Sequence, residues 1–364
     1  MFDVLYVYSG AERLGVLQNE KSIQWVENYR NSGEAKIVCA ATAENVALLS
    51  LGNRIYNPDT RTIADIVATD VVEWAGEAEL TVRAQTSAAD LDLRPIMGTE
   101  VISNVEAGMR RIYTNNRRDL PIVLGAEKGF TETISKEITW DTVLEAYQVL
   151  SEASGLGFRV VFDPATQTET MDIYKGTDRT SGEHYNGYFS TELGNMLNFS
   201  LGQNKKNYRN VAIVAGEGEG ADRVVAITSI GNPQGKDRRE MYVNAASTRK
   251  EYQILTPTGQ VDEHGNPTYT STSGTYTDAE YEAVLEQIGI SELLKNIITI
   301  TVSSEVTQNP LEFGKDYFLG DILPLKSALY NMNISARVLS ATFIREETGD
   351  KMTVTLGDFT TMEG

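Results

Sequence analysis

The stretch NVAIVAGEGEGADR (Asn210–Arg223) decides between two folds for the middle of this chain. An apolar run leads into a loop in which Gly216, Gly218 and Ala221 fit the G-x-G-x-x-G/A pattern of a dinucleotide-binding turn. Such a turn must open a helix whose first amides hold the pyrophosphate. Here the loop is followed by RVVAITSI (Arg223–Ile230), whose β-branched residues predict a strand. The pattern therefore favours a glycine turn between two strands.

The charges of this loop also argue against a phosphate-binding turn. Glu217 and Glu219 lie inside it and would repel a phosphate, since like charges 4 Å apart near a surface cost on the order of 4 kcal/mol. Asp237 has the spacing of a ribose-binding acid, but it lies in a polar turn. We therefore expect no cofactor and glycines that serve backbone geometry. We also expect Arg223 to pair with Glu217 or Glu219 and hold the turn.

The overall composition fits a folded chain of several domains. Its 364 residues are 41% hydrophobic and carry a net charge of −19, which opposes non-specific binding to nucleic acid. No apolar run is long enough to predict a membrane span. The N-terminal segment MFDVLYVYSG lacks the basic region of a signal peptide, so we expect none.

Cysteine and histidine are too scarce for several kinds of site. Cys39 is the one cysteine, which excludes an intrachain disulfide, and its segment KIVCAAT predicts a buried strand position. His184 and His264 lie in polar, turn-like segments without the context of a nucleophilic triad. We therefore expect no catalytic residue and no metal site. Paired carboxylates stay open as an alternative because 51 acidic residues make chance pairs common.

Strand patterns dominate both ends of the chain. Near the N-terminus they are VLYVY, KIVCAAT, VATDVVEW and ELTVRAQ, and the last two predict a hairpin around residues 75–78. Near the C-terminus they are IITITVSSEV, DYFLGDILPLK, SARVLSATFIREE and KMTVTLGDF. Short strands at this spacing predict small antiparallel barrels or sandwiches.

Helical patterns interrupt the strands in three places. Residues 100–113 have an apolar stripe that includes Val101, and residues 143–154 have another, with Thr139 or Asp141 as the cap. Two predicted strands, FRVVFD and ETMDIYKG, follow the second helix. The third helix begins at Asp278 after a Thr277 cap, behind a polar segment (256–277) that predicts an exposed loop or long hairpin. Strands with single intervening helices favour an α+β fold over a doubly wound sheet.

Two surface features allow more than one interpretation. The cluster Arg110, Arg111, Arg117 and Arg118 favours structural ion pairs or a subunit contact over nucleic-acid binding. The tyrosine-rich tract Tyr269–Tyr281 favours a solvated loop over a carbohydrate-binding surface.

Several segments together resemble one protein family. They are LDLRPI, GAEKGFTETISKEITWDTVLEAYQVLSEASGLGFRVVFD, MDIYKGTDRT, KNYRNVAIVAGEGEGADR, DRREMYVNA, FGKDYFLGDILPL and ARVLSATFIREETGDKMTVTLGD. In order and spacing, from Leu91 to Asp358, they resemble the baseplate-hub, tail-associated structural proteins of long-tailed (siphovirus-type) phages and prophages. The residues that the resemblance marks as a structural signature are Gly216, Glu217, Gly218, Gly220, Arg223, Arg238, Arg239, Glu240, Gly314, Asp316, Gly320, Asp321 and Gly357.

The resemblance implies a mostly β, multidomain tail-hub fold with two tube-like β-barrel domains and α/β insertions. The expected domains are a first barrel at 1–118, a helix-plus-hairpin domain at 119–199, a second barrel at 200–245 with 297–364, and an insertion at 246–296. It implies a homotrimer in the virion tail tip, made in the host cytoplasm. The ring would join and close the distal tail tube and open for genome delivery.

The implied partners are a distal tail protein or tail tube ring, a tape-measure protein, and a separate receptor-binding or lysin protein. Because the chain stops at Gly364, soon after the last expected strand, we expect no lysin extension and no enzymatic activity. Two alternatives remain at this stage. One is a carboxylate-dependent hydrolase of cell-wall polysaccharide, and the other is a carbohydrate-binding tail module that uses Tyr269–Tyr281.

Overall fold

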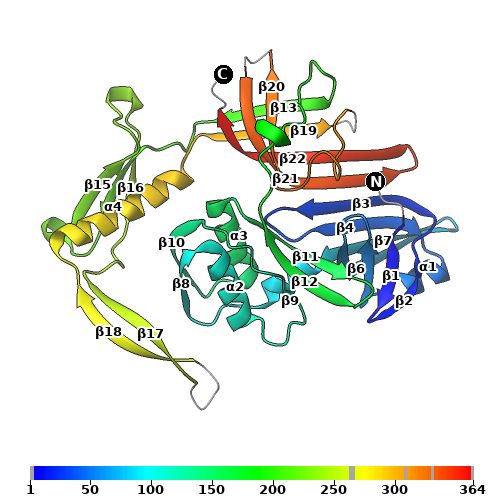
Figure 1. Ribbon diagram of the computed structural model, residues 1–364, viewed down its shortest axis with the longest axis horizontal. Coiled ribbons are helices and arrows are strands. Elements are labelled where there is room, and N and C mark those ends of the chain that lie inside the picture. The colour runs from blue at the N-terminus through cyan, green and yellow to red at the C-terminus, as the bar shows by residue number, and fades with distance from the viewer. Residues whose placement is uncertain (1–3, 262–266, 307–309, 329–331, 362–364) are drawn as a thin grey trace. The chain divides into compact units, whose positions relative to one another are not determined.

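The computed structural model describes residues 4–261, 267–306, 310–328 and 332–361 (Figure 1). The chain forms two compact units, which we call unit 1 (Met1–Ser200 with Val302–Gly364) and unit 2 (Leu201–Thr301). Strands make up most of the regular structure and single helices lie between them. The predicted α+β, mostly β fold class is therefore confirmed.

Strands from both ends of the chain form one sheet of unit 1. Its order is β13-β19-β22-β21-β3-β4-β7-β6-β5-β1-β2, and β20 pairs with β21. The N-terminal and C-terminal halves meet where β21 runs antiparallel to β3, with Ser340 opposite Asn28 and Glu346 opposite Ser22. The strands are β1 (Tyr6–Ser9), β2 (Glu12–Val16), β3 (Glu20–Asn28), β4 (Glu34–Ala40), β5 (Asn53–Asn57), β6 (Thr62–Trp74), β7 (Glu77–Thr86), β13 (Met196–Asn204), β19 (Thr299–Val306), β20 (Ile322–Ser327), β21 (Met332–Glu346) and β22 (Gly349–Thr361).

One hydrophobic core runs under both halves of this sheet. It includes Trp25 and Ile37 from the N-terminal strands and Val338 and Val354 from the C-terminal ones. Alternate residues of β3 and β4 face it, as the period-two pattern predicts. Cys39 is buried in β4, in agreement with its predicted core role. A short helix, α1 (Ala43–Leu48), follows β4.

A smaller α/β part of unit 1 follows β7. Its elements are η1 (Ser87–Leu93), β8 (Thr99–Asn104), α2 (Val105–Asn116), β9 (Val123–Leu124), β10 (Thr133–Thr139), α3 (Val143–Ser154), β11 (Gly157–Asp163), β12 (Thr168–Tyr174) and η2 (Gly182–His184). The two helices and the β11–β12 hairpin enclose their own core around Tyr113, Tyr147 and Phe158. The predicted unit of a helix packed on a hairpin is confirmed.

Two predicted helix starts in this part are wrong. Residues 99–104 form a strand, so Val101 is exposed and Asn104 caps α2 by accepting a hydrogen bond from the Ala107 amide. Thr142, rather than Thr139 or Asp141, caps α3, because Thr142 and Glu145 form a reciprocal capping box. The pairing of β8 with β10 supplies the main-chain bonds that keep residues 99–104 extended.

Unit 2 is a three-stranded sheet covered by one helix, with a hairpin attached. The hairpin prediction for Asn210–Ile230 is confirmed, since β14 and β15 pair antiparallel, and β16 lies parallel on the other side of β14. Thr277 caps α4 as predicted. The elements are β14 (Val211–Ala215), η3 (Gly220–Asp222), β15 (Val225–Ser229), η4 (Gly235–Asp237), β16 (Glu240–Asn244), β17 (Glu251–Val261), β18 (Pro267–Thr275) and α4 (Asp278–Lys295).

The polar segment before α4 is a long hairpin, β17–β18. His264 lies outside the described residues. Because β14 pairs only with β15 and β16 among the described strands, the signature turn belongs to a sheet of its own and not to the sheet of the C-terminal strands. The division of the chain into four domains remains a proposal.

Candidate functional site: two buried tyrosines and the signature residues

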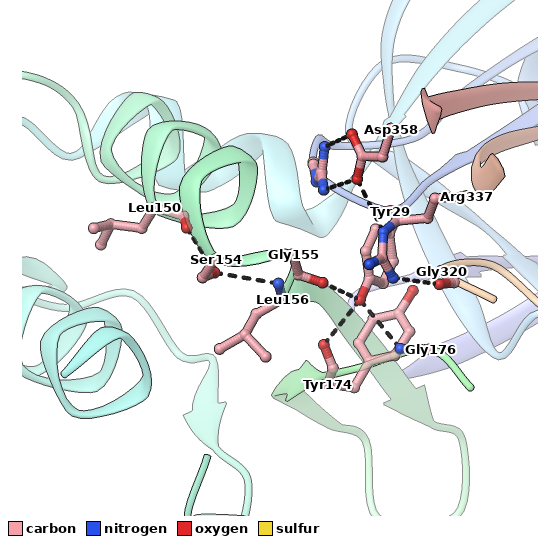
Figure 2. A network of polar contacts seen from close by, with 11 residues as sticks. Tyr29, Leu150, Ser154, Gly155, Leu156, Tyr174, Gly176, Gly320, Arg337 and Asp358 are labelled. Atoms are coloured by element: carbon pink, nitrogen blue, oxygen red, sulfur yellow. Dashed lines mark hydrogen bonds and ion pairs between the residues drawn. The ribbon is translucent and has the colours of Figure 1, made fainter. Parts of the chain in front are cut away.

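Tyr29, just after β3, is the centre of a polar network in unit 1 (Figure 2). Its hydroxyl donates to the main-chain oxygen of Gly155 at 2.9 Å and accepts from the amide of Gly176 at 3.2 Å. Its own amide bonds to Leu339 O at 2.8 Å, and its carbonyl accepts from Phe158 N at 3.1 Å. Through its side chain and main chain, this one residue therefore ties the N-terminal strands, the α/β part and the C-terminal strands together. We call this network the Tyr29 joint.

Three glycines let the chain close around the Tyr29 ring. A Cβ atom at Gly157 or at Gly320 would lie 2.2 Å from the ring, and one at Gly176 would lie 1.9 Å from the carbonyl carbon of Gly320. Gly320 also has φ +87°, which side chains rarely adopt. The Tyr174 ring packs edge-on against Tyr29, with centroids 5.1 Å apart. Any larger residue at the three glycine positions would push these segments apart.

Two arginines and one aspartate border the ring. Arg337 is buried, donates to Gly320 O at 2.7 Å, and pairs with Asp358 at 3.0 Å, while Arg30 binds the other carboxylate oxygen at 2.9 Å. Burial alone would raise the pKa of Asp358, but the hydrogen bonds and charges of the two arginines outweigh it and lower that pKa. Burial raises the pKa of the Tyr29 hydroxyl, which stays neutral.

The signature residue Asp321 fixes the next segment. It is only 2% exposed and accepts main-chain hydrogen bonds from Thr177 at 2.7 Å and Phe318 at 3.0 Å. Arg179 pairs with it at 2.5 Å. Because these bonds occupy its carboxylate oxygens, Asp321 is a structural anchor that holds residues 177–179 against the turn before β20.

The other signature residues of unit 1 serve turns and close packing. Gly314 has φ +85° in a turn where Asp316 accepts a hydrogen bond from Glu312 N at 2.9 Å. A Cβ atom at Gly357 would lie 2.3 Å from the Leu339 side chain. These positions therefore serve backbone geometry: Gly314 and Asp316 shape a turn, and Gly357 allows close packing on Leu339.

Unit 2 contains a second buried tyrosine, Tyr281 on α4. Its hydroxyl accepts from Glu217 N at 2.7 Å and donates to Thr248 O. A Cβ atom at Gly216 would lie 2.6 Å from that hydroxyl, so this glycine is required for the contact. The carboxylate of Glu217 accepts from Lys250 N at 2.9 Å. We call this arrangement the Tyr281 clamp.

Arg223 also holds the signature turn, but not through the predicted ion pair. It donates to Gly216 O at 3.1 Å and to Asn244 Oδ1 at 2.8 Å, and no salt bridge joins it to Glu217 or Glu219. The prediction is wrong because Glu217 is turned toward Lys250 N. Gly218 and Gly220 have φ +104° and +57°, as expected of turn glycines.

The remaining signature residues of unit 2 lie near the start of β16. Arg239 donates to Tyr208 O at 2.9 Å and so fixes the segment before β14. Arg238 and Glu240 form an exposed pair at 2.6 Å, which contributes little because water screens it. The signature residues thus fall into two separate clusters, one in each unit.

The described residues give little support for a metal site, a membrane span or a sugar-binding face. Within residues 4–261, 267–306, 310–328 and 332–361, no group of three or more His, Cys, Asp or Glu could hold a metal ion. No helix of the described chain is long and apolar enough to cross a membrane. Tyr281 is buried, so it offers no face to a sugar. Arg111 of the basic cluster pairs with Glu100, which fits the structural interpretation for that residue.

The chain matches a known protein family over nearly its whole length. The family model of the Siphovirus ReqiPepy6 Gp37-like proteins matches residues 4–358. This chain belongs to that family. No curated protein matches the chain.

Solved structures share the fold of this Gp37-like protein. The tail protein from Neisseria meningitidis MC58 is 12% identical, with a TM-score of 0.56 over 98% of this chain and 96% of its own. The prophage MuSo2 43 kDa tail protein from Shewanella oneidensis is 11% identical, with a TM-score of 0.58 over 98% of both chains. Prophage tail protein gp18 from Listeria monocytogenes EGD-e is 10% identical, with a TM-score of 0.50 over 97% and 94%. At these identities the likeness shows the fold, and the predicted resemblance to phage and prophage tail proteins is confirmed.

Proposed function

We propose that this Gp37-like protein is a structural component of the virion that forms a baseplate hub at the tail tip. Three copies would form a ring that joins the distal tail tube, closes it and opens for genome delivery. Its partners would be a distal tail protein or tube ring, the tape-measure protein, and a separate receptor-binding or lysin protein. The support is the family membership together with the tail-protein fold.

The observation that carries the proposal is the pairing of β21 with β3. It makes the N-terminal and C-terminal strands one continuous sheet, so each subunit presents two strand-rich halves side by side. Two such halves in each of three subunits would supply six similar segments to a ring. The Tyr29 joint fixes the halves against the α/β part, which suits a load-bearing role.

We include in the proposal that the protein is not an enzyme. The two carboxylates of the Tyr29 region, Asp321 and Asp358, are bound by arginines, and Asp321 also by main-chain amides. Carboxylates whose oxygens are occupied by such partners are poor candidates for general acid or base catalysis. Incubation of the purified chain with bacterial cell walls should release no sugar. Release that one Asp or Glu substitution abolishes would overturn this part.

The oligomeric state tests the ring. Native mass spectrometry and light scattering of the purified chain should find a complex of three 40.1 kDa subunits. Addition of the distal tail protein of the same phage should then give a larger complex with one defined stoichiometry. A strict monomer at high concentration, both alone and with that partner, would contradict the proposal.

A further inference from the structure

A largely buried arginine joins the large sheet of unit 1 to the α/β part. Arg54 on β5 pairs with Asp65 on β6 at 2.9 Å and with Glu169 on β12 at 2.7 Å. The same guanidinium donates to the Ser87 hydroxyl on η1 at 2.8 Å. One side chain of the sheet therefore holds both η1 and β12 of the α/β part.

A third carboxylate, that of Asp90, lies beside this guanidinium. In a 3₁₀ helix such as η1, residues three positions apart lie on the same face, so Asp90 shares the face on which Ser87 contacts Arg54. Asp90 is half-buried, and within the described part of the chain it makes no hydrogen bond and no salt bridge. We call Arg54, Asp65, Asp90 and Glu169 the Arg54 cluster.

The acids of the Arg54 cluster outnumber the cations that face them. Three carboxylates share Arg54, and Arg94, which follows η1, is the second arginine that acts on Asp90. Glu169 Oε2 is buried and accepts no hydrogen bond within the described residues. Like charges at a partly buried site repel more strongly than in water, because less solvent screens them. A charge on Asp90 therefore weakens the contact between η1, β12 and the sheet.

Other charged groups on the elements around η1 are exposed or have partners elsewhere. Asp92 on η1 itself accepts from the Thr142 hydroxyl. On the neighbouring elements, Arg159 pairs with Asp172, Asp163 accepts from Ala165 N, Glu145 caps α3, Glu79 pairs with Lys21, and Asp70, Glu73, Glu77, Arg83 and Glu152 are exposed.

The protonation of Asp90 follows from this environment. Burial, then the charges of Asp65 and Glu169, raise the pKa of Asp90 to about 6 from its ordinary 3.8, although Arg54 and Arg94 act against the rise. The folded chain thus takes up this proton at a higher pH than the unfolded chain. The resulting stabilisation is complete below pH 3.8 and is lost as the pH rises through about 6.

We propose that the Arg54 cluster is a pH-sensitive contact that holds the α/β part more tightly on the large sheet when Asp90 is neutral. In mild acid, the uncharged carboxyl group no longer repels Asp65 and Glu169. At neutral pH, ionised Asp90 makes it easier for η1 and β12 to open from β5 and β6. The proposal goes beyond the tail-tip function and does not depend on it.

Asp90→Asn tests the contact, because asparagine has nearly the shape of aspartic acid and stays neutral at every pH. Urea unfolding of the full chain should find the variant more stable than the native chain at about pH 8, with a difference that shrinks through pH 6 and disappears near pH 4. Because burial also raises the pKa of Asp65 and Glu27, only the difference between the two chains reports on Asp90.

Hydrogen exchange with mass spectrometry locates the effect. After correction for intrinsic rates, opening of Ser87–Leu93 and Thr168–Tyr174 at about pH 8 should be slower in Asp90→Asn, whereas unit 2 should be unchanged. The two pKa values of Asp90 allow a change of up to about a hundredfold, and its partial exposure to water should reduce this to about tenfold.

Two further variants provide controls. Asp70→Asn makes the same chemical change at an exposed position of β6 and should give a small difference that does not depend on pH. In a chain that carries Asp65→Asn, the gain from Asp90→Asn should be smaller, because one repelling charge is gone and Arg54 is free to pair with Asp90. An equal gain in both backgrounds would show that the charges are not coupled and would contradict the proposal.

The remaining outcomes also decide the proposal. It is wrong if Asp90→Asn is unfolded or less stable than the native chain at about pH 8, or if their difference is the same at every pH. Both measurements use the chain whether or not it assembles. Failure of the pH-sensitive contact therefore leaves the hub proposal intact, and a chain that never forms a trimer leaves this test unaffected.

Discussion

The Tyr29 joint and the Tyr281 clamp both fix chain segments through a buried tyrosine hydroxyl. They differ in how far apart in the sequence those segments lie. In both, a buried tyrosine hydroxyl accepts from one main-chain amide and donates to a main-chain carbonyl, beside a glycine that leaves no room for a side chain. The Tyr29 hydroxyl also lies 3.3 Å from a second carbonyl, that of Tyr174. Tyr281 bonds to residues 33 and 64 positions away inside unit 2. Tyr29 bonds to residues 126 and 147 positions away and gathers three parts of unit 1.

The two tyrosines also differ in their charged neighbours. The Arg337 guanidinium lies over the Tyr29 ring at 5.5 Å and is neutralised by Asp358. Tyr281 has only main-chain partners for its hydroxyl and apolar neighbours such as Leu285. This comparison indicates that one anchoring hydroxyl is enough for a local turn. A joint between distant segments needs close packing, hydrogen bonds and a compensated charge together.

The largest expected effect comes from substitution of Gly320. Gly314, which has a similar backbone conformation, provides the control. Gly320 has φ +87° and touches Tyr29, whereas Gly314 has φ +85° and open space around its Cβ position. Alanine at either position costs about 1–2 kcal/mol in backbone strain, and Gly320→Ala costs about 1–3 kcal/mol more through the clash with Tyr29. Urea unfolding measures both variants. Equal losses for the two would show that Tyr29 does not determine the packing.

Removal of each tyrosine hydroxyl should have an intermediate effect. Tyr29→Phe and Tyr281→Phe each leave one amide and at least one carbonyl without this partner, which should cost about 1–3 kcal/mol. Hydrogen exchange with mass spectrometry should show faster exchange around Gly155 and Gly176 in the first variant and around Glu217 in the second.

An exposed tyrosine provides the control for both variants. Tyr185 is 44% exposed, and Tyr185→Phe should change stability by less than about 0.5 kcal/mol. If Tyr29→Phe accelerates exchange only near residue 29, the hydroxyl does not couple the end of β3 to the α/β part.

The smallest expected effect is the pH dependence of the stability that Asp358 contributes. The folded-state pKa of Asp358 lies below its ordinary value of 3.8, so its stabilising contribution is present above that pH and is lost as the pH falls through the folded-state value. Asp358→Asn should therefore lower the urea midpoint at pH 7, and its difference from the native chain should shrink below pH 3.8. A constant difference at all pH values would contradict this assignment.

Asp278 in unit 2 provides the control for the effect of Asp358 on stability. The pKa of Asp278 is also lowered, by Lys250, but this pair lies in water. Asp278→Asn should change the stability of unit 2 much less than Asp358→Asn changes that of unit 1, because solvent screens the exposed pair.

Local patterns predicted the parts of the site that depend on neighbouring residues. Glycines and β-branched residues predicted the β14–β15 turn, and Thr277 predicted the start of α4. The partners of Arg223 were wrongly predicted, because Glu217 is taken by a main-chain amide that the sequence places 33 residues away. Tyr29 was missed altogether, since nothing in its own segment distinguishes it from the other 16 tyrosines.

The sequence by itself determined the strand-rich α+β class, the turns and the helix-cap at Thr277, because periodicity and turn chemistry act over a few residues. Only the tertiary structure decided that β21 pairs with β3, that three glycines close around Tyr29, and that Arg337 and Arg30 share Asp358. Apart from the Arg337–Asp358 pair, which spans 21 positions, those contacts join residues more than a hundred positions apart. Their selection depends on packing across the whole unit, where a single added methyl group is enough to exclude one arrangement.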